Sequence, residues 1–194
     1  MEKCPFCLTE NTMSYIGKDS STSLCTNTVD CPICGQYKIS MEFAEDIDKM
    51  KEITPKVKAI LSGYTREKTY LKADNYEIPV LLHGNYQDIY NSPIVPRSVS
   101  EKVYKLLNYL NVKASDFGEP VSINLSLDRS ITYSVSQKEL REIIYELYGE
   151  HLIDIYNEAG VKHGRNLNPD IIILDKTLIM DLKLTMKGIQ YLEQ

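Results

Sequence analysis

The sequence predicts an α+β protein in which a small, metal-stabilised β segment precedes a mainly helical body. Two observations carry this prediction. The spacing CxxC occurs twice within the first 35 of the 194 residues, as CPFC from Cys4 to Cys7 and as CPICG from Cys31 to Gly35. Farther along, apolar residues recur every three or four positions in several segments that start with a helix-capping residue, whereas only short stretches alternate as strands do.

The four paired cysteines are candidate metal ligands. A CxxC turn brings two sulfurs together, and two such turns complete the tetrahedral thiolate set typical of structural zinc. A proline inside each turn restricts the backbone, and Gly35 permits a left-handed conformation. We therefore expect a zinc ribbon over residues 1–40 with zinc as a structural cofactor, held by Cys4, Cys7, Cys31 and Cys34. Because protein sulfurs fill all four positions, such a site is closed to substrate.

Other interpretations of the cysteines remain open. A redox-active CxxC pair expects a βαβ setting, which this segment lacks. Disulfides would leave one of the five cysteines unpaired and require an oxidising compartment. The fifth cysteine, Cys25, lies in the polar stretch SSTSLCTNTVD. We expect it to be a small buried side chain, although it could replace Cys31 as a ligand.

Composition restricts the function classes. Hydrophobic residues make up 43% of the chain and charged residues 25%, as in ordinary globular proteins. The net charge of −5 disfavours sequence-independent nucleic-acid binding, which needs clustered positive charge. No apolar run approaches the roughly 20 residues that span a bilayer, and the start MEKCPFC lacks a signal-peptide segment. We expect a cytoplasmic protein without a membrane partner, whose cysteines are thiols.

Residues 41–74 predict a helical segment. Ser40 precedes apolar residues at positions 43, 47 and 50, and Thr54 followed by Pro55 is a second helix start. The second helix carries an apolar stripe at positions 57, 60, 61 and 64. Residues 75–99 are rich in proline and turn formers, and IPVLL is their candidate strand. We expect an irregular crossing segment there.

Residues 100–194 predict a winged-helix-like domain. A helix over EKVYKLLNYL, capped by Ser100, precedes the strand-like EPVSINLSLD and a helix over SQKELREIIYELYG, where Ser136 and Glu139 match a capping box. HLIDIY and IIILDKTLIMDLKL then resemble two strands around a loop, and Thr185 can cap a last helix. This order of helix, strand, helix and hairpin is typical of a winged helix.

The strongest of these helices is acidic on its polar side. Its glutamates at positions 139, 142, 146 and 150 are accompanied by only two basic residues, and a helix that enters DNA needs basic or amide side chains. A winged-helix DNA-binding regulator is therefore an alternative that charge disfavours. The predicted loop holds Lys162, His163 and Arg165 beside two glycines. These residues could contact a phosphate or nucleotide ligand, or form a solvated loop.

Catalytic signatures are scarce. The chain contains no glycine-rich phosphate loop, HExxH motif or nucleophile elbow, so we do not expect an enzyme. One alternative remains, a magnesium-dependent nuclease, in which Asp170 and Asp181 would hold the metal and Lys183 would lie near the attacking water. In SGYTRE, Arg66 and Glu67 are expected to pair with neighbours on or near their own helix.

The chain from residue 4 to residue 193 resembles the N-terminal region of bacterial proteins of uncertain function, several of them linked to antiphage defence. The shared features are the CxxC and CPxCG turns, LSG-x-x-RE at residues 61–67 and LT-x-KG-x-x-x-LE at residues 184–193. In such proteins an effector similar to Toll/interleukin-receptor nucleotide hydrolases often follows the last helix. The resemblance implies that this chain is either truncated before such an effector or a stand-alone relative.

Taken together, these features predict a non-enzymatic zinc-binding module that senses or adapts, and that regulates an effector in bacterial defence. The expected partner is another protein or a second copy of the chain. A small-molecule signal is an additional possibility. Nucleic acid remains a partner that the acidic charge disfavours.

Overall fold

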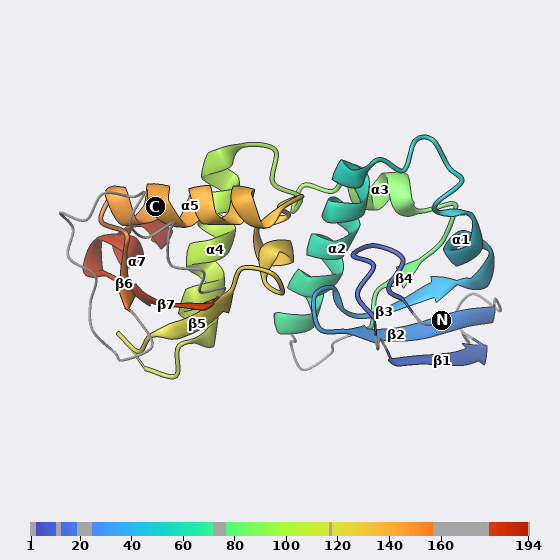
Figure 1. Cartoon of the computed structure of the whole chain (residues 1–194), viewed down its shortest axis with the longest axis horizontal. Helices are drawn as coiled ribbons and strands as arrows, with labels where there is room; N and C mark the ends of the chain where they lie inside the picture. The colour runs from blue at the N-terminus through green and yellow to red at the C-terminus, as the bar shows by residue number, and fades with distance from the viewer. Residues whose placement is uncertain are drawn as a thin grey trace. The chain divides into compact units, whose positions relative to one another are not determined.

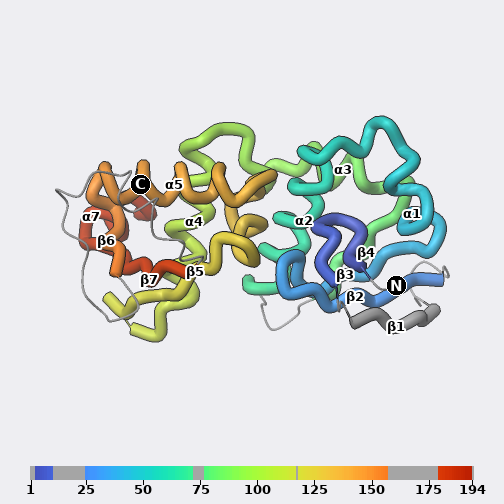
Figure 2. Tube along the Cα trace, in the orientation of Figure 1, coloured from blue at the N-terminus to red at the C-terminus, as the bar shows by residue number. Residues whose placement is uncertain are grey.

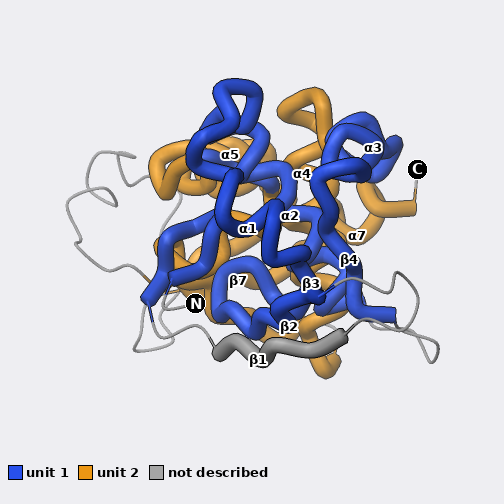
Figure 3. The backbone as a smooth tube through the Cα atoms, turned by 90° about the vertical axis from the view of Figure 1, so that its right-hand side faces the viewer, with its two compact units in different colours: residues 1–95, 133–135 blue, residues 96–132, 136–194 orange. Residues whose placement is uncertain are grey.

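The computed structural model describes residues 3–10, 13–18, 25–71, 77–116, 118–156 and 179–193 (Figure 1). Helices and strands both occur throughout, which confirms the α+β class. The chain divides into two compact units: unit 1 is residues 1–95 with 133–135, and unit 2 is residues 96–132 with 136–194 (Figure 3). Among the described residues, no helix combines the length and the apolar character needed to cross a membrane.

Unit 1 contains a four-stranded sheet with the order β1-β2-β3-β4 (Figure 2). The strands are β1 (Met13–Lys18), β2 (Cys25–Cys31), β3 (Gly35–Ser40) and β4 (Val80–Leu81). Neighbours among the first three run antiparallel, whereas the short β4 pairs parallel to β3. The two-residue β4 is the part of the predicted IPVLL strand that pairs with the sheet. The sheet therefore joins the cysteine-rich hairpin to the crossing segment.

The described residues of unit 1 also form the helices α1 (Met41–Asp46), α2 (Pro55–Tyr70) and α3 (Tyr86–Asn91). The predicted caps are confirmed, since the Ser40 hydroxyl accepts from the Phe43 amide and Thr54 accepts from the Val57 amide. The first helix was predicted to reach position 50 but ends at Asp46. There the backbone turns, and the Lys49 N–H donates to the Asp46 carbonyl at 2.8 Å. This turn lets the following chain reach Thr54, where α2 begins.

The core of unit 1 lies between its sheet and its helices. The helix α2 packs on β3 (Figure 1). Of the predicted α2 stripe, Ile60 and Leu61 are buried and the other two members are half-buried. The largest fully buried side chains come from strands and helices alike, namely Tyr37, Ile39, Phe43, Ile47, Leu61 and Leu81. The sequence pattern thus identified the helical side of this core.

The described part of unit 2 packs helices against a three-stranded antiparallel sheet with the order β5-β7-β6. In chain order its elements are α4 (Val99–Lys113), β5 (Val121–Asn124), the 3-10 helix η1 (Arg129–Thr132), α5 (Gln137–Gly149), β6 (Ile153–Tyr156), β7 (Ile179–Leu184) and α7 (Met186–Leu192). The predicted apolar faces of α4 and α5 are all buried, as positions 103, 106, 107 and 110 and positions 140, 143, 144 and 147.

The last helix of unit 2 is fixed by the LT-x-KG residues. Thr185 caps α7, accepting from the Gly188 amide, and its hydroxyl also donates to the His151 carbonyl at 2.7 Å. The Lys187 ammonium donates to the Glu150 carbonyl at 2.7 Å. A Cβ on Gly188 would lie 2.2 Å from the Leu152 carbonyl oxygen, so only glycine allows this approach. These contacts hold α7 against the turn between α5 and β6.

The cap of α4 corrects a sequence prediction. Ser98, not Ser100, is the N-cap, and it forms a reciprocal capping box with Glu101. Serine occurs at both positions, and only Ser98 is followed by an acidic residue three positions later. This spacing was the overlooked signal.

The position of this cap can be tested with two matched serines. We expect Ser98→Ala to lower the free energy of unfolding by about 1 kcal/mol, because the Glu101 amide loses its acceptor. We expect Ser100→Ala, inside the helix, to change it by less than about 0.5 kcal/mol. Urea unfolding followed by circular dichroism measures both, and an equal loss in the two variants would contradict the assignment.

Candidate metal centre

The four paired cysteine sulfurs converge at one point of unit 1. The Sγ atoms of Cys4 and Cys34 are 3.6 Å apart, those of Cys7 and Cys31 are 3.5 Å apart, and all four lie within 4.8 Å of one another. A tetrahedral ion with metal–sulfur bonds of about 2.3 Å separates its sulfurs by about 3.8 Å. The cysteines are free rather than joined as disulfides. The spacing therefore fits a single bound metal ion.

Each of the two CxxC turns is followed directly by a residue with a positive φ angle. Gly35, directly after the last ligand, has φ +76, and Leu8, directly after Cys7, has φ +61. At Gly35 a Cβ would also lie 2.2 Å from the Thr69 hydroxyl, so glycine is required there. Leu8 adopts the same left-handed region at a steric cost of roughly 1–2 kcal/mol, and it is 59% exposed. The first turn is thus formed without the glycine that the second one uses.

Each of the four sulfurs has a hydrogen-bonding neighbour besides the other sulfurs. The Tyr37 hydroxyl lies 3.1 Å from Cys4 Sγ, and the Ser62 hydroxyl lies 3.0 Å from Cys34 Sγ. Thr9 Oγ1 is 3.1 Å from Cys7 Sγ, and the Cys34 amide donates to Cys31 Sγ at 3.4 Å. Such contacts orient metal ligands and disperse thiolate charge. These neighbours could therefore orient the sulfurs if they bind a metal ion as thiolates.

Helix α2 supports the second turn through its LSG-x-x-RE residues. The Thr65 hydroxyl donates to the Cys34 carbonyl at 2.7 Å, and the Arg66 guanidinium donates to the Pro32 carbonyl at 3.0 Å. The Gln36 amide donates to Thr69 at 2.8 Å. A single face of α2 thus satisfies backbone groups on both sides of Cys34.

The burial of the cysteine side chains limits the net negative charge that the cluster can hold. Cys4, Cys31 and Cys34 are at most 1% exposed, and burial raises the pKa of Cys34 well above its ordinary value. Hydrogen bonds from Cys31 and Cys34 lower the pKa of the half-buried Cys7. Four thiolates cannot coexist in so dry a space without a compensating cation. A divalent ion satisfies this requirement, and sulfur ligands favour a soft or borderline metal.

Sequence reasoning identified the four cysteines that converge but missed their neighbours. Cys25, predicted to be buried, is exposed and lies outside the cluster. Cys25 begins β2 and Cys31 ends it, so the length of the strand, at about 3.3 Å per residue, separates Cys25 from the sulfur set. Tyr37 and Ser62 were not predicted, because nothing in their local sequence marks them as contacts of a sulfur.

Other predicted site residues have mixed outcomes. Lys162, His163, Arg165 and Asp170 lie outside the described residues. Asp181 and Lys183 lie on β7, where Asp181 accepts from the Ser122 hydroxyl. Asp154, buried on β6, pairs in register with Lys183 and was not anticipated. The nuclease alternative therefore stays a prediction.

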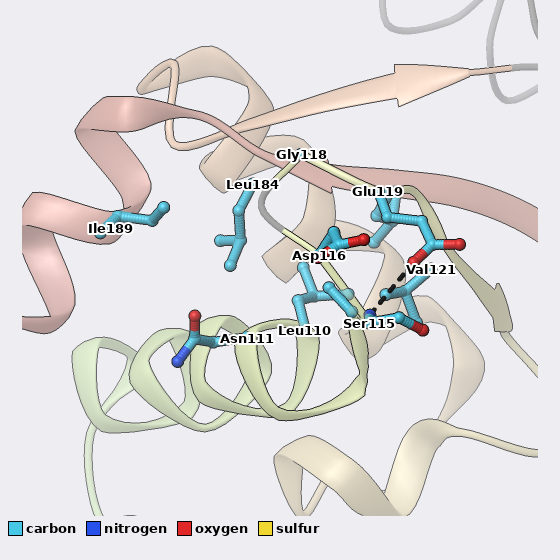
Figure 4. A pocket seen from close by; sticks show the side chains of 11 residues that line it. Leu110, Asn111, Ser115, Asp116, Gly118, Glu119, Val121, Leu184 and Ile189 are labelled. Carbon is cyan, nitrogen blue, oxygen red and sulfur yellow. Dashed lines mark hydrogen bonds between the residues drawn. The ribbon is translucent and has the colours of Figure 1, made fainter.

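A separate cavity lies in unit 2, with a volume of about 270 Å³ (Figure 4). Apolar side chains from α4, β7 and α7 line part of it, including Leu110, Leu184 and Ile189. Asp116 and Glu119 are its acidic residues, and a Glu119 carboxylate oxygen accepts from the Ser115 amide at 3.1 Å. Among the lining residues that the structure describes there is no histidine or cysteine. The cavity therefore offers space but no recognisable nucleophile–base pair.

Comparison with known proteins found no matching family model, no matching curated protein and no matching solved structure.

Proposed function

We propose that this protein is a non-enzymatic sensing or adaptor module, in which a zinc ribbon stabilises unit 1 and a winged-helix-like unit 2 offers a binding surface. The proposed role is to regulate an effector in a bacterial defence system by binding a protein or a small ligand. The observation that carries the proposal is the sulfur cluster, because four protein ligands leave no metal position for a substrate.

Zinc is the metal that we propose. An all-thiolate tetrahedral set is the usual structural zinc site, and the reduced state of all four ligands agrees with it. The ligands would be Cys4, Cys7, Cys31 and Cys34. When bound, zinc would neutralise thiolate charge and tie the β1–β3 hairpins to the first turn. The remaining chemistry of the module would then depend on surfaces elsewhere.

The order of elements in unit 2 supports a winged-helix-like arrangement. A helix, a strand, a short 3-10 helix and a second helix precede two further strands, and the last of these lies between the other two. In such an arrangement α5 takes the place of the helix that DNA-binding relatives insert into the major groove. Glu142 and Glu146 are exposed on α5, and Glu150 is exposed directly after its last residue. Phosphates would be repelled there, so a protein partner is favoured over DNA.

Light scattering coupled to size-exclusion chromatography tests the proposal. We expect the zinc-loaded chain, alone or after incubation with extract of its own source cells, to enter a complex of fixed stoichiometry. The complex should survive nuclease treatment and 0.5 M salt. A chain that stays monomeric in every sample would overturn the adaptor role.

DNA binding by unit 2 is the second candidate, and the order of its elements is the observation that favours it. Electrophoretic mobility shift with mixed genomic fragments at moderate salt separates the two. The adaptor proposal expects no shift. A shift that disappears in the variant with Lys162→Glu and Arg165→Glu would favour the DNA-binding candidate instead.

A further inference from the structure

Unit 2 also contains an apolar groove, separate from the cavity near Asp116 and Glu119. It has a volume of about 280 Å³ and lies among the start of α4, the end of α5 and α7. Its floor is apolar, with Val103, Leu147 and Leu152 exposed by only 6%, 1% and 5%. At its edge Val99 is 64% exposed. The groove therefore presents an apolar binding surface that extends from the exposed Val99 to buried core residues.

The charges around this groove are unusual for a helix end. The last turn of α5 contains no basic residue, and the glutamates at positions 146 and 150 line the groove there. Because a helix dipole already places partial negative charge at its C-terminus, cations rather than carboxylates are stabilising at this position. The arrangement leaves an excess of negative charge beside an apolar floor.

Lys187, a basic residue that lines the groove, already contacts Glu150. Lys187 donates to the Glu150 carbonyl at 2.7 Å, and its ammonium lies 3.8 Å from the Glu150 carboxylate. One turn earlier, Glu142 has Lys138 at 3.7 Å. Glu146 has no such partner among the residues that the structure describes. A ligand that brings a positive charge to Glu146 would therefore complete the pairing.

Exposed apolar surface continues from the groove along α4. Tyr104 is 44% exposed and lies four residues after Ser100, which lines the groove, so both share one side of the helix. An occupant that contacts this surface must bring apolar side chains as well as charge. Acidic peptides and nucleic acid fail the charge requirement, and a purely polar cation leaves the floor unfilled.

We propose that this groove binds a short protein segment in which apolar side chains are flanked by lysine or arginine. The inference rests on the proposed adaptor function and specifies the chemistry of its partner. An apolar side chain of the segment would occupy the floor formed by Val103, Leu147 and Leu152. A basic side chain of the segment would pair with Glu146 at the end of α5.

The test uses three fluorescein-labelled hexapeptides with the full zinc-loaded chain at 0.15 M salt. The first has the order Arg-Lys-Leu-Leu-Lys-Arg, the second replaces both leucines by serine, and the third replaces the basic residues by glutamate. By fluorescence anisotropy, we expect the first peptide to bind at least tenfold more tightly than either of the others. Equal binding of the first two would reduce the interaction to simple charge attraction and overturn the proposal.

Matched variants locate the site. We expect Glu146→Lys, which reverses the charge, and Val99→Ser, which removes apolar surface without adding charge, each to weaken binding of the first peptide at least fivefold. Both positions are exposed, so the fold should tolerate the changes. Glu142→Lys makes the same charge change on the same helix outside the groove, and we expect an effect below twofold. A Glu142→Lys effect as large as that of Glu146→Lys would overturn the assignment.

Methyl NMR gives a readout that does not depend on variants. Titration of the first peptide should shift the methyl signals of Val103, Leu147 and Leu152 ahead of those elsewhere, and shifts confined to other residues would contradict the groove.

If the chain dimerises and Val99→Glu abolishes the dimer, a second copy is the occupant and the proposal fails. If stoichiometric complexes form in the light-scattering experiment without any binding of the first peptide, only the groove assignment is wrong. If both experiments are negative, the adaptor role fails as well.

Discussion

Replacement of Cys34 by serine is expected to abolish metal binding and to unfold unit 1. Cys34 is fully buried, so the variant loses one of four thiolates and leaves a poor ligand in its place. Structural zinc contributes about 10–16 kcal/mol of apparent binding free energy in small domains, whereas whole proteins are stable by only about 5–15 kcal/mol. The loss is therefore large enough to exceed the stability of the unit.

Two measurements check this result. Metal content by mass spectrometry should fall from one ion per chain to near zero, and amides of β2 and β3 should lose their protection from hydrogen exchange. Cys25→Ser is the matched control, because Cys25 is exposed and lies outside the cluster. We expect it to keep both the metal and the protection. Metal loss in the control, or retention in Cys34→Ser, would show that the ligand set is wrong.

The cysteine cluster was predictable because the information that specifies it is local in the sequence. Ligand type and CxxC spacing occur in continuous sequence, so four positions could be assigned without a structure. The hydroxyls of Tyr37 and Ser62 reach the sulfurs from β3 and α2, and only the packed fold brings them there. Neither apolar periodicity nor residue spacing in the sequence predicts that these two elements bring their hydroxyls to the same sulfur cluster. Secondary contacts of a site are therefore harder to predict than its ligands.

The same distinction separates helix faces from helix ends. The buried faces of α4 and α5 follow from apolar spacing, because a period of 3.6 residues places those positions on one side. The start of α4 depends instead on which of two serines bonds an amide, and that choice is made by Glu101. The early end of α1 depends on a turn at Asp46 rather than on apolar spacing.

The LSG-x-x-RE residues illustrate why long-range partners escape prediction. Arg66 and Glu67 were expected to pair near their own helix. Arg66 donates to the Pro32 carbonyl, and Glu67 accepts from the Tyr133 hydroxyl at 2.6 Å, which are contacts with residues far away in the sequence. These partners are 34 and 66 residues away in sequence. The motif residues thus contact the Cys31–Cys34 turn from one side of α2 and Tyr133 from the other.

Gly63→Ala is expected to lower the free energy of unfolding by about 3 kcal/mol, the upper end of the usual cost of overpacking. A Cβ at position 63 would lie 2.5–2.8 Å from three atoms of the Tyr133 ring. The ring cannot easily retreat, because Tyr133 is 2% exposed and its hydroxyl is bonded to Glu67. Burial and the nearby Glu67 charge raise the pKa of Tyr133, so the hydroxyl stays protonated and donates.

Guanidinium unfolding measures the effect, with Gly84→Ala as the control in the same unit. No atom lies within 4 Å of a Cβ at Gly84, so we expect a change below about 0.5 kcal/mol there. A double-mutant cycle identifies the cause. The cost of Gly63→Ala should disappear beside Tyr133→Ala, which removes the ring, and persist beside Tyr133→Phe, which removes only the hydroxyl. If Gly63→Ala were tolerated as well as Gly84→Ala, the ring would not lie against α2. A cost that persisted beside Tyr133→Ala would instead place the clash with some other neighbour of Gly63.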